Sequence, residues 1–330
     1  MPDIAFQDNG ATIWQGDCRE VLRGLEESSI HCVVTSPPYW GLRDYGTDGQ
    51  LGLEEPPADH VANMVEVFRE VRRVLREDGT LWLNYGDSYA ASGATGHGGF
   101  DGNNKKPDGT ARKNRQAGSK WARGRTAVGG LKPKDLCGIP WRVSFARQED
   151  GWWLRQDIIW HKPNPMPESC TDRCTKAHEY IFLLAKSPRY YYDADAVREK
   201  AKYGRRKWSD IEGVLAAATT AADTRADHGV RVSASVTGAD PTAGRNRRSV
   251  WTIATAPYPG AHFATFPPDL VKPCIMAGCP DGGTVLDPFT GSGTVAEVAR
   301  ANGCKFVGAE LNPEYIELAK KRLQQRGLFV

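Results

Sequence analysis

The chain has 330 residues, 40% of them hydrophobic, and a mean hydropathy of −0.51. This length suits an α/β domain with a large insertion or a small second lobe, and the lack of a long apolar run argues against a membrane span. The net charge of +3 identifies no partner by itself. The first ten residues lack the basic and apolar regions of a signal peptide, so we expect a cytoplasmic protein with reduced cysteines.

The first forty residues predict two strands with a helix between them. Residues 11–17 are typical of a strand, residues 18–27 place apolar side chains on one helix face, and residues 30–40 have the pattern of a buried strand. Because proline cannot donate to a sheet ladder, the chain must leave the sheet at Pro37 and Pro38.

A helix is predicted next, over residues 59–77, from apolar side chains at helical spacing. Asp59 is expected to cap its start, and Asp78 with Gly79 is expected to close its end. Residues 80–87 then predict another buried strand. This alternation of strands and helices is typical of a mostly parallel sheet with helices on both faces.

Two polar stretches interrupt the alternation. Residues 88–134 are rich in Gly, Ser, Asn, Lys and Arg, which predicts a long flexible basic loop. Such a loop is either a solvated insertion or an arm that contacts phosphates, and the motifs described below favour the arm. Residues 200–250 are again polar and irregular. The basic side chains that we expect to contact DNA are Lys105, Lys106, Arg112 and Lys113.

Two groups of cysteines have spacings that suggest a metal site, namely Cys170 and Cys174 with His178, and Cys274 with Cys279. A structural zinc site usually takes four ligands in close pairs, and neither group supplies them. We therefore predict no metal and interpret the cysteines as small buried apolar residues.

The last eighty residues predict a strand, a glycine-rich turn, a helix, a strand and a final helix. In the turn, Gly291 and Gly293 let the backbone approach a ligand, and no Gly-Lys-Ser/Thr follows, so it is not a P-loop. Glu310 ends the next strand, where an acid usually binds two ribose hydroxyls. Asp287 can accept from an ammonium group, which S-adenosylmethionine offers and a dinucleotide does not.

The segment from Thr35 to Trp40 gives the sharpest functional signal. An aromatic amine is a poor nucleophile because its lone pair is delocalised into the ring, and acceptors aimed at its N–H groups favour the more tetrahedral form that attacks a methyl sulfonium. Ser36 Oγ and the Pro37 carbonyl can supply these acceptors, and proline stiffness fixes their direction. Tyr39 offers a flat face on which a base can stack.

These motifs resemble those of the DNA amino-methyltransferases, which methylate adenine N6 or cytosine N4. The catalytic tetrapeptide Asp/Asn/Ser-Pro-Pro-Tyr matches Ser36, Pro37, Pro38 and Tyr39, and the cofactor motif matches Asp287 to Thr294. The catalytic motif precedes the cofactor motif, which is the order of the family's β class. The resemblance implies that S-adenosylmethionine is held by Asp17, Thr265, Phe266, Asp287, Phe289, Gly291, Ser292, Gly293, Thr294 and Glu310. It also implies a base pocket that includes Trp40, Trp160 and Lys162.

The resemblance implies a Rossmann-like, doubly wound, circularly permuted α/β fold that flips a base out of double-stranded DNA. It also suggests a homodimer, a restriction–modification setting and no membrane. Ser36 is more frequent in cytosine-N4 enzymes than in adenine-N6 enzymes, but both bases stay open. An RNA or protein-glutamine methyltransferase and an inactive DNA-binding regulator are the alternatives. The expected parts are the catalytic half (1–90 and 136–199), the DNA-contacting loop (91–135), a target-recognition region (200–250) and the cofactor half (251–330).

Overall fold

The computed structural model describes residues 2–8, 10–90, 130–200, 244–256 and 267–325. The chain divides into two units, residues 1–192 with 249–330, and residues 193–248. The sheet and the site discussed below belong to the first unit. Of the predicted site residues, Lys105, Lys106, Arg112, Lys113, Thr265 and Phe266 lie outside the described residues, as do most of the predicted basic loop and of the 200–250 region.

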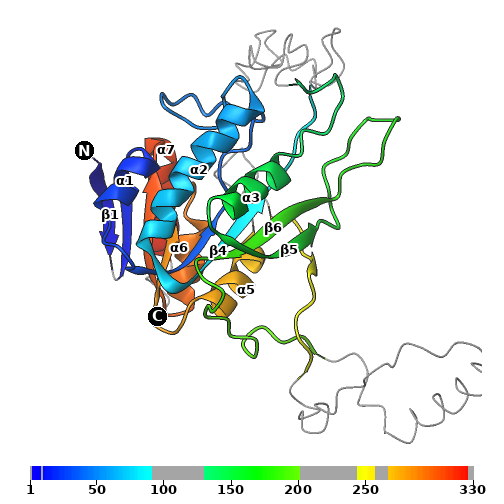
Figure 1. Ribbon diagram of the computed structural model, residues 1–330. Coiled ribbons are helices and arrows are strands. Elements are labelled where there is room, and N and C mark those ends of the chain that lie inside the picture. Colours follow the sequence, from blue (N-terminus) through cyan, green and yellow to red (C-terminus); the bar gives the residue numbers. More distant parts are fainter. Residues whose placement is uncertain (1, 9, 91–129, 201–243, 257–266, 326–330) are drawn as a thin grey trace, which may run out of the picture. The chain divides into compact units, whose positions relative to one another are not determined.

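A nine-stranded sheet in the order β1-β2-β9-β8-β3-β4-β6-β5-β7 forms the centre of the first unit (Figure 1). The strands from β2 to β4 are parallel neighbours, whereas β1 and β6 are antiparallel to the strands beside them. This confirms the predicted, mostly parallel α/β sheet. The strands are β1 (Asp3–Asp8), β2 (Ala11–Gln15), β3 (Ile30–Thr35), β4 (Leu75–Tyr85), β5 (Trp153–His161), β6 (His178–Ala185), β7 (Val250–Thr252), β8 (Thr284–Asp287) and β9 (Lys305–Glu310).

Helices pack on both faces of this sheet (Figure 1). One face is covered by α1 (Cys18–Gly24), α2 (Pro57–Val74) and α3 (Ile139–Glu149), whose apolar side chains form a single core with those of the strands. The other face is covered by α5 (Pro268–Gly278), α6 (Thr294–Ala301) and α7 (Pro313–Gln325). No helix in the described ranges is both long enough and apolar enough to cross a membrane.

The predicted boundaries of the helix at 59–77 were wrong at both ends. Helix α2 starts at Pro57, so Asp59 lies in its first turn and does not cap it, and the helix ends at Val74. Strand β4 begins directly at Leu75, which is fully buried and pairs with Ile30. The expected stop at Asp78 and Gly79 is instead an irregularity within β4, where the register jumps before Thr80 pairs with Cys32. Burial of Leu75 against β3 thus overrides the helical pattern.

Other elements were not predicted or were interpreted differently. Strands β1 and β7 and helix α5 had no counterpart among the predicted elements; α5 has a proline, Pro273, inside it and is buried along most of its length. The expectation of buried cysteines holds for six positions, but Cys170 and Cys174 are exposed, because they lie on the loop between β5 and β6 and not in the core.

Gly293 allows close packing of the cofactor turn against helix α7. It lies at the start of α6 with φ of +80°, and a Cβ there would be 2.9 Å from Ala319 Cβ. Exposed Gly282 has a similar φ of +70° but open space around it. Gly293→Ala is therefore expected to lower the free energy of unfolding by about 2–4 kcal/mol, and Gly282→Ala by only about 1 kcal/mol, in urea titrations. Equal losses would contradict close packing at Ala319.

Candidate active site

One cavity is lined by both of the motifs that the sequence singled out. Residues 36–39 and 288–292 border it, together with Asp17, Asn84 and Glu310. The reason is topological: β3 and β8 are parallel neighbours, with Val33 opposite Leu286, so their carboxyl ends meet at the same edge of the sheet. Motifs that are separated by about 250 residues in the sequence are therefore adjacent in the fold.

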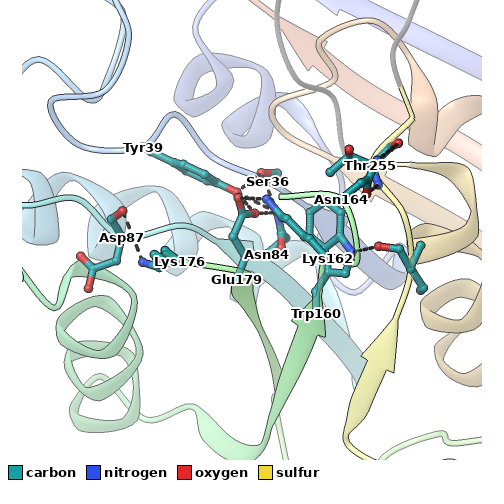
Figure 2. Close-up of polar contacts among 11 residues, drawn as sticks. Ser36, Tyr39, Asn84, Asp87, Trp160, Lys162, Asn164, Lys176, Glu179 and Thr255 are labelled. Atoms are coloured by element: carbon teal, nitrogen blue, oxygen red, sulfur yellow. Dashed lines mark hydrogen bonds and ion pairs between the residues drawn. The ribbon is translucent and has the colours of Figure 1, made fainter. Parts of the chain in front are cut away.

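The side chains of the catalytic motif take part in a hydrogen-bond network (Figure 2). Ser36 Oγ donates to the Tyr39 hydroxyl over 3.3 Å, and the Tyr39 hydroxyl donates to Glu179 Oε2 over 2.9 Å. Asn84 Nδ2 donates to the Tyr39 hydroxyl, at 2.8 Å, and to Ser36 Oγ and Glu179 Oε2, both at 3.3 Å. Four polar side chains from β4, β6 and the loop after β3 thus converge on one wall of the cavity.

The ring of Tyr39 is held in place on its inner side. It stacks on Tyr85, with ring centroids 5.2 Å apart and an interplanar angle of 21°. Gly86 permits this position, because a Cβ there would be 2.5 Å from Tyr39 Cε2. Burial, reinforced by the nearby Glu179 charge, raises the pKa of Tyr39 well above its usual value. The hydroxyl is therefore neutral at physiological pH and can both donate and accept.

Lys162 and Trp160 lie on the other side of Glu179. Lys162 Nζ forms an ion pair with Glu179 Oε1 and lies 4.3 Å from the centroid of the Trp160 ring. Trp160 Nε1 donates to the Ile253 carbonyl over 2.8 Å, which ties β5 to the chain beyond β7. Both residues line the cavity.

Asn84 and Glu179 were not predicted as site residues. Asn84 is a polar side chain among buried apolar residues at the carboxyl end of the predicted strand 80–87, and it is only 3% exposed. Glu179 is a partly buried charged residue that precedes the apolar run of β6. A polar residue at the end of an apolar strand was thus the available signal.

Asp287 connects the catalytic strand to the cofactor turn. Its Oδ1 accepts from Thr35 Oγ1 at 2.6 Å and from the Phe289 backbone N–H at 3.0 Å. Its Oδ2 is buried and has no hydrogen-bond partner among the described residues. Burial raises the pKa of Asp287 to about 7. Asp287 is not among the residues that line the cavity, although the five residues after it are.

Glu310 lines the cavity and holds the glycine-rich turn. Its Oε2 accepts from the Gly291 N–H at 2.7 Å, and its Oε1 accepts from the Asn312 N–H at 2.8 Å. Burial raises the pKa of Glu310 above its usual value. Each oxygen has a further lone pair, so the carboxylate can still accept from a ligand hydroxyl.

Asp17 caps helix α1 at the edge of the cavity. It accepts from the Arg19 backbone N–H at 2.8 Å and forms an ion pair with the Arg19 guanidinium. Burial would raise the pKa of Asp17, but the hydrogen bonds and charge of Arg19 outweigh burial and lower it. The side chain is therefore an ionised acceptor beside the cavity.

The remaining predicted residues separate into two groups. Gly293 and Trp40 do not line the cavity: Gly293 packs on α7, and Trp40 is 5% exposed in the core with its Nε1 donating to the Glu54 carbonyl. The prediction that Trp40 contributes to the base pocket is therefore corrected, because the chain turns it inward after Tyr39. The residues that do line the cavity are Pro37, Pro38, Phe289, Gly291, Ser292 and Thr294.

The proteins most similar in sequence include type II methyltransferases, the class of enzyme that the motifs indicated. The chain is 47% identical to the type II methyltransferase M.Cfr9I of Citrobacter freundii over 316 residues, which are 96% of this chain and 88% of that protein. It is 46% identical to the type II methyltransferase M.SmaI of Serratia marcescens over 311 residues, 94% of this chain and 90% of the other.

Solved structures share the fold. The cytosine-N4-specific PvuII DNA methyltransferase superposes with a TM-score of 0.62 at 18% identity, covering 97% of this chain and 88% of that chain. A protein of Thermus thermophilus, described as a DNA modification methylase and solved with S-adenosyl-L-methionine, superposes with a TM-score of 0.54 at 23% identity, covering 96% and 95%. The DNA methylase family model for N6 and N4 enzymes matches residues 30–321. The chain therefore belongs to the DNA methylases that modify exocyclic amino groups.

Proposed function

We propose that this protein transfers a methyl group from S-adenosylmethionine to the exocyclic amino group of a flipped-out base in double-stranded DNA, at a specific sequence. The observation that carries the proposal is the single cavity shared by the Ser36–Tyr39 motif and the 288–292 turn. One cavity that both motifs line can hold a methyl donor and an amine side by side, which the transfer requires. The relatives named as type II methyltransferases support the same activity.

The residues of the turn fit S-adenosylmethionine. The buried Asp287 Oδ2, which lacks a partner among the described residues, suits an ammonium group, and the Glu310 carboxylate suits ribose hydroxyls. Asp17 lies on the same cavity, where the resemblance places the adenine. When bound, S-adenosylmethionine supplies an electrophilic methyl group on a sulfonium.

The catalytic motif acts on the amine. Ser36 Oγ and the Pro37 carbonyl accept from the two N–H groups, which turns the nitrogen lone pair toward the methyl donor. The Pro38 carbonyl already accepts from the Tyr85 hydroxyl over 3.4 Å, which holds the loop after β3 in place. The cavity side of the Tyr39 ring supports the base, while its inner face rests on Tyr85.

We propose cytosine as the target base, because Ser36 occupies the first position of the catalytic tetrapeptide. The stretches 91–135 and 200–250 are proposed to contact DNA and to select its sequence. We also propose a cytoplasmic location, because the substrate DNA is in that compartment. A homodimer is a further proposal.

Nucleoside mass spectrometry tests the product. DNA from a methylation-deficient host that expresses the protein is digested and compared with DNA from the same host expressing the Ser36→Ala variant. We expect N4-methylcytosine in the first sample and its loss in the second. N6-methyladenine instead would correct the base but keep the class. Neither product, from protein that still binds S-adenosylmethionine, would favour RNA, a protein glutamine or a DNA-binding regulator.

A further inference from the structure

A chain of hydrogen bonds leads from the catalytic serine to a carboxylate on the same wall of the cavity. Ser36 Oγ donates to the Tyr39 hydroxyl, and the Tyr39 hydroxyl donates to Glu179 Oε2 (Figure 2). Each hydroxyl in this chain accepts at its oxygen and donates its own proton onward. A proton that arrives at Ser36 Oγ can therefore reach Glu179 without movement of any heavy atom.

The reaction of an exocyclic amine produces such a proton. As the amine nitrogen bonds to the methyl carbon and the carbon–sulfur bond breaks, the nitrogen becomes positively charged while it still carries two hydrogens. Loss of one of these protons restores the neutral, methylated amine. In the proposed reaction, the N–H group from which Ser36 Oγ accepts lies at the start of this hydrogen-bond chain.

We propose that Glu179 is the acceptor of this proton, working through Tyr39 and Ser36. The amine proton passes to Ser36 Oγ, the Ser36 hydroxyl proton passes to Tyr39, and the Tyr39 hydroxyl proton passes to Glu179 Oε2. The nitrogen is neutral afterwards, both hydroxyls are restored, and Glu179 holds the added proton until it is lost to solvent. The proposal deepens the proposed function and rests on it.

Glu179 has a cationic partner on the oxygen that the chain of hydroxyls does not use. Lys162 Nζ forms an ion pair with Oε1, whereas the Tyr39 hydroxyl donates to Oε2. The Glu179 side chain is 17% exposed, so the proton has a route to solvent. Lys176 also interacts electrostatically with Glu179, and burial lowers the pKa of Lys176.

Asn84 cannot replace Glu179 as the acceptor. Its Nδ2 donates to Ser36, Tyr39 and Glu179, and an amide nitrogen that donates has no lone pair available for a proton. Its contribution is to hold the three oxygens of the chain at fixed positions. Within the described ranges, two side chains form hydrogen bonds with Ser36. Of these, only Tyr39 can pass a proton on to Glu179.

Single-turnover methyl transfer tests the proposal in Glu179→Gln, Tyr39→Phe and the double variant. Glutamine still accepts from the Tyr39 hydroxyl but does not take up a proton, and phenylalanine keeps the ring while removing the link. Each variant is expected to lower the rate about 100-fold, the lower end of what acid–base catalysis contributes. Glu179→Asp keeps a carboxylate and should restore most of the rate that Glu179→Gln loses.

Non-additivity provides the second criterion. Because both residues belong to one chain of proton transfer, the double variant should be no slower than the slower single variant. Multiplied effects, a wild-type rate in Glu179→Gln, or a Glu179→Asp variant as slow as Glu179→Gln would each overturn the proposal. If Glu179→Gln does not fold, a wild-type rate in Tyr39→Phe would overturn it alone.

Glu77→Gln is the matched control. Glu77 forms an ion pair with Lys186, which lies just beyond the opposite end of β6, at 2.9 Å. Neither residue lines the cavity, so the change removes the same charge from an ion pair outside the site. Its rate should be that of the wild type, and the cofactor and DNA affinities of all variants should be unchanged. Failure of the wild type to methylate DNA would reject the proposed function itself, whereas an active wild type with unaffected variants would reject only the proton path.

Discussion

Replacement of Ser36 by alanine is expected to lower the rate of methyl transfer about 10²- to 10³-fold, the cost usually seen when one preorganised polar contact to the reacting group is removed. The amine loses the hydroxyl that turns its lone pair toward the methyl donor. The fold should tolerate the change, because Asn84 Nδ2 keeps its contacts with Tyr39 and Glu179. Rapid-quench methylation of duplex DNA measures the rate, and calorimetry measures the affinity for S-adenosylmethionine, which should not change.

Ser29→Ala is the control for this prediction. Ser29 precedes β3 just as Ser36 follows it, and its hydroxyl donates to the Glu26 carbonyl on the surface. The control should methylate DNA at the wild-type rate. If Ser36→Ala matched it, the role given to the Ser36 hydroxyl would be wrong.

Replacement of Asp287 by asparagine is expected to change how stability depends on pH. Burial raises the pKa of Asp287 from 3.8 to about 7, so the folded protein binds a proton that the unfolded chain has already released. The stability that this group contributes is therefore fully present below about pH 4 and is lost as the pH rises through about 7. Asparagine does not ionise, so the free energy of unfolding of the variant does not contain this loss. The difference in the free energy of unfolding, variant minus wild type, should therefore be a few kcal/mol larger at about pH 8 than at about pH 4.

Urea unfolding of both proteins at these two pH values measures the effect. Subtraction of the two proteins cancels the groups they share, and Glu310, whose charge also raises the pKa of Asp287, is present in both. An ammonium ligand stabilises the ionised carboxylate, so S-adenosylmethionine should stabilise the wild type at about pH 8. The difference in the free energy of unfolding between the variant and the wild type should then become smaller. A difference that is independent of pH would show that folding does not raise the pKa of Asp287.

The positions of the two main motifs were predictable because they depend on rules of sheet topology. Ser36 and Gly291 each follow a strand, and parallel neighbouring strands bring such residues together. Trp40 was assigned wrongly because its place in the motif does not reveal the direction of its side chain. It is the burial of Trp40 against the core, with a carbonyl partner at Glu54, that turns it away from the cavity.

Glu179 could not be placed from sequence for a different reason. It enters the site from β6, which runs antiparallel between β4 and β5 and is 140 residues from Tyr39 in sequence. No periodicity in the apolar run of β6 indicates which neighbour that strand pairs with. Helix α5 was missed for a related reason, since its buried, proline-containing sequence shows little helical contrast between faces.

The hydrogen bonds of Asp287 have a consequence for insertions in the chain. One carboxylate oxygen accepts from both Thr35 Oγ1 and the Phe289 N–H, so the end of β3 is tied directly to the turn after β8, 252 residues further along the chain. This contact does not depend on the length of the loops between the two segments. We therefore expect insertions or deletions in those loops to leave the catalytic motif beside the glycine-rich turn.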